Sequence, residues 1–129
     1  MDNPSKRTTV LVVEDEPLVN WNIADLLRDD GFNVLQAFTG EDALAIIEKG
    51  NDIRLVFADI NLPGRLDGIA LASKIQNRSP HIEVLLTSAF NRERLEKLDI
   101  VRLYGRFVPK PYPPEAVVRR IREIVGQAA

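Results

Sequence analysis

The sequence alternates five times between a short apolar run and a longer segment whose apolar residues have helical spacing. Short runs that are apolar throughout and rich in β-branched residues are typical of strands buried on both faces. Apolar residues three or four positions apart are typical of helices with one buried face. Five such units predict a parallel sheet with helices on both faces. The predicted strands are residues 10–13, 34–37, 55–58, 82–86 and 107–108.

Capping and turn residues mark the limits of the predicted helices. Thr39 stands three residues before Asp42, which is a capping-box-like helix start. A weaker, highly charged helix is predicted over residues 91–98, and Pro113 with Pro114 is predicted to open the last helix. The order of elements predicts the fold class α/β, with a flavodoxin-like (βα)5 doubly wound parallel sheet in strand order 2-1-3-4-5.

The composition limits the classes of protein to which the chain can belong. We expect a single domain over residues 1–129, with a core of about residues 8–126 and flexible ends at 1–7 and 127–129. The absence of cysteine excludes disulfides and thiolate metal sites and fits a cytoplasmic protein. A net charge of −2 provides no overall basic field for nucleic acid, and there is no apolar run of about 18 residues to span a membrane.

Polar residues follow the predicted strands, and ligands bind beyond the carboxyl ends of the strands in sheets of this kind. The residues there are Glu14 and Asp15 after the first strand, Asp59 after the third, Thr87 and Ser88 after the fourth, and Lys110 with Pro111 after the fifth. Three carboxylates gathered at one edge would repel one another. Mg²⁺ prefers oxygen ligands, so the pattern predicts a magnesium site.

The same residues predict phosphoryl transfer to a carboxylate. Asp59 is the candidate phospho-acceptor because it stands alone at the end of a strand, and aspartate forms aspartyl-phosphate in known enzymes. Glu14 and Asp15 would then act as metal ligands, one of them through water. Lys110 offers a mobile positive charge and Thr87 a hydroxyl for the phosphoryl oxygens. Because the transition state is loose, positioning and charge neutralisation would supply most of the catalysis.

Taken in order, these motifs resemble the receiver domain of two-component response regulators, of the single-domain type found in chemotaxis regulators. The resemblance covers about residues 8–126. The motifs that carry it are Glu14-Asp15, Asp59 within residues 58–63, Asp67-Gly68, Thr87-Ser88-Ala89 and residues 107–111. It implies that the phosphohistidine of a sensor histidine kinase, or of a histidine phosphotransfer protein, donates to Asp59.

The resemblance also implies a ligand set and a switch. Asp15, Asp59 and the backbone carbonyl of Asn61 hold Mg²⁺, and Thr87 with Phe107 forms the switch. The face made by the fourth helix, the fifth strand and the fifth helix then changes its affinity for a downstream protein, and it allows a homodimer. Ser88 and Pro111 have supporting roles, and the Lys110–Pro111 bond is cis in the family.

The chain departs from the commonest receiver pattern at three places. The loop from Asp59 to Gly68 is one residue longer, because Arg65-Leu66 replaces a single residue. Leu62 stands where methionine is frequent, and its volume is similar. The switch aromatic is Phe107 rather than tyrosine, so it has no hydroxyl.

Other interpretations stay open at this point. Asp15 could instead cap the first helix, and Asp59 could be a turn residue. A phosphatase of the haloacid-dehalogenase type needs an aspartate where this chain has Asn61, and a flavin-binding module needs a phosphate loop where it has acidic residues. A degenerate receiver that binds partners without phosphorylation is the main alternative.

The expected role is that of a signalling module, not of an enzyme that turns over a separate substrate. The last predicted helix ends near Gly126 and leaves only three residues. We therefore expect either a stand-alone regulator or a piece of a larger regulator or hybrid kinase.

Overall fold

The computed structural model of the chain describes residues 7–89 and 106–127, and it contains a five-stranded sheet in the order β2-β1-β3-β4-β5. Neighbouring strands are parallel throughout. The predicted fold class and strand order are therefore confirmed. In chain order the elements are β1 (Thr9–Val13), α1 (Pro17–Asp29), β2 (Asn33–Ala37), α2 (Gly40–Glu48), β3 (Ile53–Asp59), α3 (Gly68–Arg78), β4 (Glu83–Ser88), β5 (Phe107–Pro109) and α6 (Pro114–Gln127).

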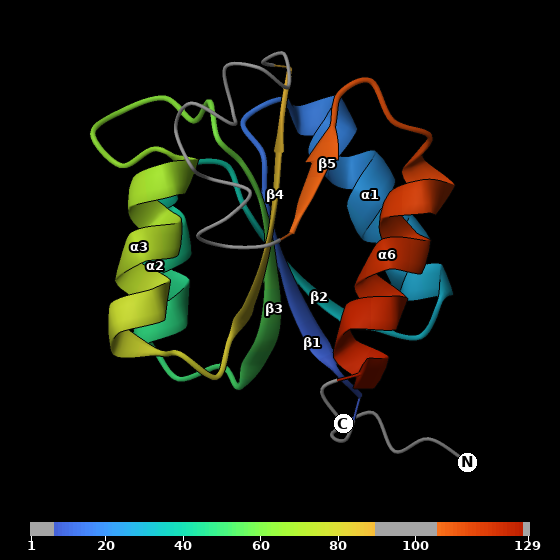
Figure 1. Cartoon of the computed structure of the whole chain (residues 1–129), viewed down its shortest axis with the longest axis horizontal. Helices are drawn as coiled ribbons and strands as arrows, with labels where there is room; N and C mark the ends of the chain where they lie inside the picture. Colours follow the sequence, from blue (N-terminus) through green and yellow to red (C-terminus); the bar gives the residue numbers. More distant parts are fainter. Residues whose placement is uncertain (1–6, 90–105, 128–129) are drawn as a thin grey trace.

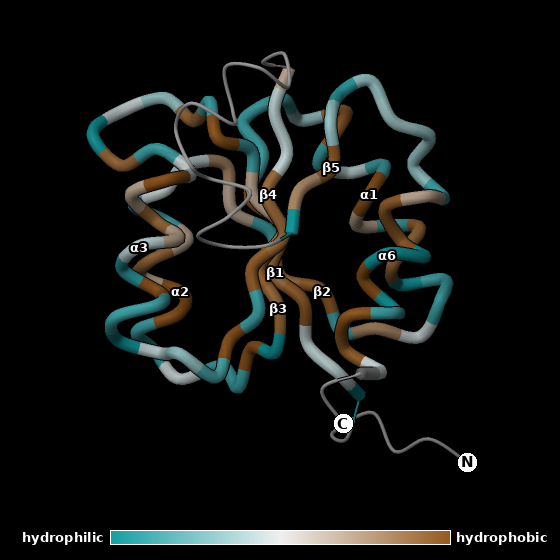
Figure 2. Tube along the Cα trace, in the orientation of Figure 1, coloured by the Kyte–Doolittle hydropathy of each residue, from teal (hydrophilic) through white to brown (hydrophobic). Residues whose placement is uncertain are grey.

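Helices cover both faces of the sheet, with α2 and α3 on one side and α1 and α6 on the other (Figure 1). Successive side chains of a strand point to opposite faces, so each buried strand supplies two hydrophobic clusters. In β1, Leu11 and Val13 pack in the cluster on the side of α2 and α3. Val10 and Val12 pack in the cluster on the side of α1 and α6. Figure 2 shows the resulting hydrophobic strands along the middle of the molecule.

The limits of several elements follow from local hydrogen bonds. The Thr39 hydroxyl accepts a hydrogen bond from the Asp42 backbone N–H at 3.1 Å, which confirms the predicted start of α2. The N-cap residue of α1 is Glu16, without a side-chain capping bond, so the alternative role of Asp15 as the cap is wrong. The predicted segment 91–98 lies outside the described residues. The fifth predicted helix corresponds to α6.

The fourth strand extends further than its apolar residues indicate. The prediction ended it at Leu86, but β4 continues through Thr87 and Ser88. Thr87 pairs in register with Asp59, and the Ile60 N–H donates to the Thr87 carbonyl at 2.8 Å. Backbone pairing does not depend on side-chain polarity, so the ladder continues past the hydrophobic core. Asp59 and Thr87 are therefore fixed by the sheet rather than by loops.

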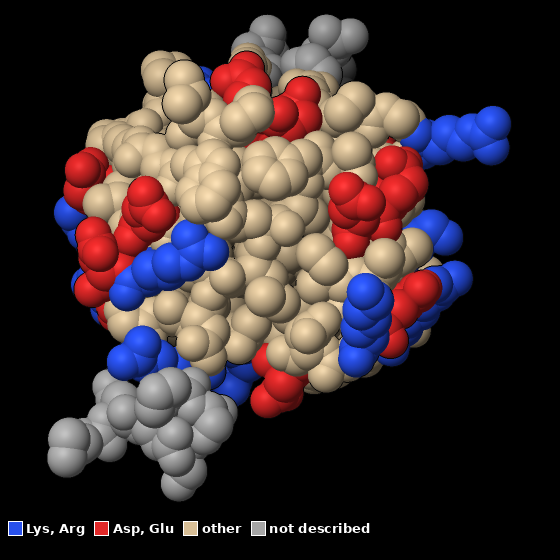
Figure 3. Space-filling view, turned by 180° about the vertical axis from the view of Figure 1, so that it is seen from behind, with Lys and Arg blue, Asp and Glu red and all other residues tan. Residues whose placement is uncertain are grey.

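The face seen in Figure 3 carries acidic and basic side chains around a mainly neutral centre. Two large apolar side chains of α1 reach the surface, since Leu18 is 85% exposed and Trp21 is 51% exposed. Single exposed apolar residues are common in monomers, but two within one helical turn leave an apolar area on α1. Among the described residues, no helix is long and apolar enough to cross a membrane.

Candidate functional site

The parallel register brings the predicted polar residues to one edge of the sheet. Val13 of β1 pairs with Ala58 of β3, so Glu14 and Asp15 lie beside Asp59. Ligand atoms of these three carboxylates lie within 4.8 Å of one another. Glu14 is 3% exposed and Asp59 is 5% exposed, whereas Asp15 is exposed. The structure therefore assembles the acidic cluster that the sequence predicted.

The acidic cluster is electrostatically crowded. Burial, followed by the hydrogen bond and the negative charge of Asp59, raises the pKa of Glu14 from 4.5 to about 7. Lys110 opposes this change with its positive charge. The potential metal ligands are all oxygen atoms, and the carboxylates that supply them outnumber the ammonium group of Lys110. This chemistry fits a hard cation such as Mg²⁺.

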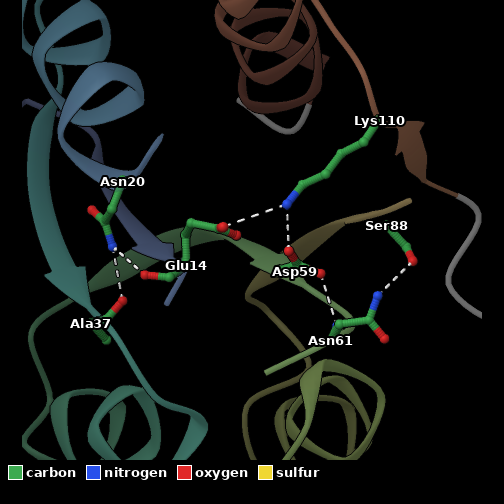
Figure 4. Close-up of polar contacts among 7 residues, drawn as sticks. All are labelled: Glu14, Asn20, Ala37, Asp59, Asn61, Ser88 and Lys110. Atoms are coloured by element: carbon green, nitrogen blue, oxygen red, sulfur yellow. Dashed lines mark hydrogen bonds and ion pairs between the residues drawn. The ribbon is translucent and has the colours of Figure 1, made fainter. Parts of the chain in front are cut away.

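Lys110 is the cation that reaches into the cluster from the segment after β5 (Figure 4). Its Nζ lies 2.6 Å from Asp59 Oδ2 and 3.4 Å from Glu14 Oε1. Although burial opposes it, the hydrogen bond to Asp59 and the charges of Asp59 and Glu14 raise the pKa of Lys110. The Lys110 N–H donates to the Ser88 carbonyl at 3.0 Å, and the Lys110–Pro111 bond is cis, as predicted.

Asn61 fixes the second oxygen of the Asp59 carboxylate. The Asn61 backbone N–H donates to Asp59 Oδ1 at 2.8 Å, and the Asn61 side-chain amide donates to the Ser88 hydroxyl at 3.2 Å. Each Asp59 oxygen therefore has its own donor, as Figure 4 shows. A carboxylate held from two sides keeps one orientation, which is useful for a nucleophile.

Thr87 and Phe107, the predicted switch residues, occupy neighbouring strands. Thr87 is 1% exposed, and its Oγ1 has no hydrogen-bond partner among the described residues. A buried hydroxyl without a hydrogen-bond partner destabilises the fold by about 1–3 kcal/mol. A hydrogen-bond acceptor added beside Asp59 would remove this cost for Thr87. Phe107 pairs in register with Leu86 and is half-buried against the cluster on the side of α2 and α3.

One buried residue at this edge was missed by the sequence reasoning. Asn20 of α1 is fully buried, and its side-chain amide donates to the Glu14 and Ala37 carbonyls, both at 3.0 Å (Figure 4). Its Oδ1 accepts from Gln36 Nε2 at 2.9 Å. The signal was present, because Asn20 stands three residues before the buried Ile23 on the inward face of the helix. A polar residue at such a position needs buried partners.

Comparison with known proteins agrees with this fold. A family model described as the response regulator receiver domain matches residues 10–122. A CheY-like response regulator receiver domain protein from Methanospirillum hungatei JF-1 has a similar fold, with a TM-score of 0.85 and 21% identity, over 95% of this chain and 97% of that one.

Two curated relatives are larger than this chain. The sensory transduction protein RegX3 of Mycolicibacterium smegmatis is 32% identical over 123 residues, which cover 95% of this chain and 52% of that protein. The nitrogen assimilation regulatory protein NtrX of Azorhizobium caulinodans is 32% identical over 110 residues, which cover 84% and 24%. The chain thus spans about half of one relative and a quarter of the other. The family model matches most of the chain, which shows that the chain belongs to the response regulator receiver domains of two-component systems.

Proposed function

We propose that this receiver accepts a phosphoryl group on Asp59 from the phosphohistidine of a sensor histidine kinase or a histidine phosphotransfer protein. The observation that carries the proposal is the fixed, buried Asp59 carboxylate, with Lys110 on one oxygen and the Asn61 N–H on the other. In the reaction an Asp59 oxygen forms the bond to phosphorus as the phosphorus–nitrogen bond breaks. The electron pair of that bond stays on the imidazole, which takes up a proton.

The acidic cluster supports a bound Mg²⁺ as the cofactor. The residues that would hold it are the side chains of Glu14, Asp15 and Asp59 and the backbone carbonyl of Asn61. When bound, the cation would neutralise charge on the phosphoryl oxygens and on the carboxylates. Burial is the main cause of the raised pKa of Glu14, and the neighbouring Asp59 adds to it, so a bound cation would favour the charged carboxylates.

Lys110 and Thr87 would serve the phosphoryl group after transfer. The Lys110 ammonium would pair with a phosphoryl oxygen, and the Thr87 hydroxyl would donate to another. Movement of Thr87 would let Phe107 change its position and so alter the surface around β5 and α6. This is a shift between two states biased by one new charged group, which changes affinity for a downstream protein.

The family of the chain and its apolar surface near the site both indicate protein partners. Receiver domains interact with sensor kinases and with downstream effectors, and this chain would act as the acceptor in one transfer rather than as an enzyme on a separate substrate. A pocket of about 370 Å³ beside α1 is lined by Leu18 and by Lys110 and Tyr112 of the segment after β5. Together with the exposed Trp21, this apolar surface next to the site supports a protein as the phosphodonor.

Intact-protein mass spectrometry with acetyl phosphate tests the proposal. We expect a gain of one phosphoryl group with Mg²⁺ and none in excess chelator. Asp59→Asn should abolish the gain, whereas Asp42→Asn makes the same chemical change at an exposed site of α2 and should leave it intact. Labelling of Asp59→Asn at the wild-type rate would contradict the assignment. A wild-type protein that binds no Mg²⁺ and takes no label would favour the degenerate-receiver alternative.

A further inference from the structure

The loop from Asp59 to Gly68, one residue longer than the common receiver pattern, is packed against the start of α2. Leu66 is 8% exposed and belongs to the cluster on the side of α2 and α3, and Leu62 is 7% exposed in the same cluster. Pro63, Gly64 and Arg65 of the loop are exposed, but its two leucines point into the core. The longer loop thus places a second apolar side chain in the core.

Glu41 makes the polar contact between α2 and this loop. Its Oε1 accepts a hydrogen bond from the Leu66 backbone N–H at 2.9 Å. Glu41 stands in the solvent-exposed first turn of α2, next to Asp42. A bond from a backbone N–H to a carboxylate is charge-assisted and stronger than a neutral one.

Two glycines show how closely the loop approaches the helix. Gly64 has φ +88, and a Cβ there would lie 3.1 Å from Glu41 Oε2. A Cβ at Gly40 would lie 2.1 Å from the Leu66 carbonyl oxygen, closer than any side chain allows. The Glu41 carboxylate thus lies against the loop at both Gly64 and Leu66.

The contacts of Glu41 at Gly64 and Leu66 lie three and five residues after Asn61 in the chain. The Asn61 N–H and side chain are already bound to Asp59 and Ser88. The position of the Asn61 carbonyl then depends on the chain that follows it, up to the bond at Leu66. If that bond were absent, a cation would have to order the loop as it binds, and the lost entropy would weaken the affinity.

We propose that Glu41 is a positioning residue for the cation site, because its bond to Leu66 holds the loop that carries Asn61. The proposal rests on the Mg²⁺ site of the proposed function. It assigns to the first turn of α2 a role in metal affinity without any contact between Glu41 and the metal.

Isothermal titration calorimetry with Mg²⁺ on the full chain tests this role with four variants. Glu41→Ala removes the acceptor, and Glu41→Asp keeps the charge but shortens the reach to Leu66. Glu41→Gln keeps an acceptor oxygen at the same distance. Asp42→Ala is the matched control, because it removes a carboxylate from the same helical turn and carries the same loss of helix-dipole stabilisation.

We expect Glu41→Ala and Glu41→Asp to bind Mg²⁺ about tenfold more weakly, as loss of an outer partner of a metal site typically does. Glu41→Gln should stay within about threefold of wild type, because a neutral hydrogen bond keeps part of the strength of a charged one. Asp42→Ala should bind as the wild type does. In the metal-free protein, hydrogen exchange at the Leu66 amide should become faster in Glu41→Ala and Glu41→Asp only.

The outcomes separate the two proposals. Wild-type protein that binds Mg²⁺, with Glu41→Ala and Glu41→Asp that bind equally well, would overturn the role of Glu41 and leave the proposed function intact. Equal weakening by Asp42→Ala would also overturn it, since the effect would then come from charge or helix stability. Wild-type protein that binds no Mg²⁺ would overturn the proposed cofactor and this inference together.

Discussion

At the residue scale, the site depends on the balance between two buried carboxylates and one lysine. Glu14 and Asp59 are almost fully buried, and Lys110 lies within 3.4 Å of both. Such a group of charges is stabilising only while each charge keeps its partner. We therefore expect loss of the Lys110 charge to act on the phosphorylation rate and loss of the Glu14 charge to act on the free energy of unfolding.

Lys110→Ala should slow labelling of Asp59 by acetyl phosphate about 100-fold at saturating Mg²⁺, because a charge aimed at the transferred group is lost. The initial rate of phosphoryl gain by mass spectrometry measures the effect. Lys49→Ala, an exposed lysine at the end of α2 away from the site, is the control and should label normally. A normal rate in Lys110→Ala would show that this ammonium does not serve the transfer.

The raised pKa of Glu14 predicts a pH dependence of stability in chelator. A pKa of about 7, against 4.5 ordinarily, means that the folded state favours the protonated carboxyl. The stabilisation that results from this raised pKa is fully present below about pH 4.5, and it is lost as pH rises through about 7. Urea unfolding should show Glu14→Gln gaining about 1–3 kcal/mol over wild type between pH 5 and pH 8.

The difference between the two proteins isolates Glu14, since other titrating groups are common to both. Parallel stability curves over this pH range would mean that Glu14 is not the titrating group.

At the element scale, α1 is joined to the ends of two strands through a single side chain. Asn20 donates to the carbonyl of Glu14 after β1 and to that of Ala37 at the end of β2. Asn20→Ala leaves these buried acceptors with fewer donors and should lower the free energy of unfolding by about 1–3 kcal/mol. Asn22→Ala, at an exposed position of the same helix, should change it by less than about 0.5 kcal/mol.

Chemical denaturation in chelator measures both variants. Equal stability of Asn20→Ala and Asn22→Ala would show that the buried bonds of Asn20 do not contribute.

The elements also show what could be predicted from the sequence. The strands that form the core were predicted because continuous β-branched runs indicate burial on both faces. The order 2-1-3-4-5 was predicted as the commonest arrangement of five such units, and the structure confirms it. The end of β4 was placed two residues early, because Thr87 and Ser88 pair through backbone atoms that hydrophobic patterning does not report.

The candidate site was also predicted only in part. Carboxylates directly after buried strands were found because parallel strands end at one edge. Asn20 and Glu41 were missed because each binds backbone atoms that are distant in sequence, at Ala37 and at Leu66. Local spacing reports which face of a helix is buried, but not which carbonyl or N–H the side chain reaches.

In the molecule as a whole, the site residues come partly from the sheet and partly from the segments that follow its strands. The sheet fixes Asp59 and Thr87 in register, while Lys110 and Asn61 come from the segments that follow β5 and β3. Under the proposed function, a phosphoryl group on Asp59 would act first on these two segments. That arrangement suits a module whose phosphorylated state is read by another protein.

Reductive trapping of the labelled protein identifies the residue that carries the phosphoryl group. Borohydride converts an aspartyl-phosphate to homoserine, and peptide sequencing by mass spectrometry then locates the modified position. If Asp59 is the phospho-acceptor, we expect homoserine at position 59 after treatment with acetyl phosphate and Mg²⁺, and unmodified aspartate there in chelator. Homoserine at another aspartate, with Asp59 unchanged in the labelled protein, would contradict this role of Asp59.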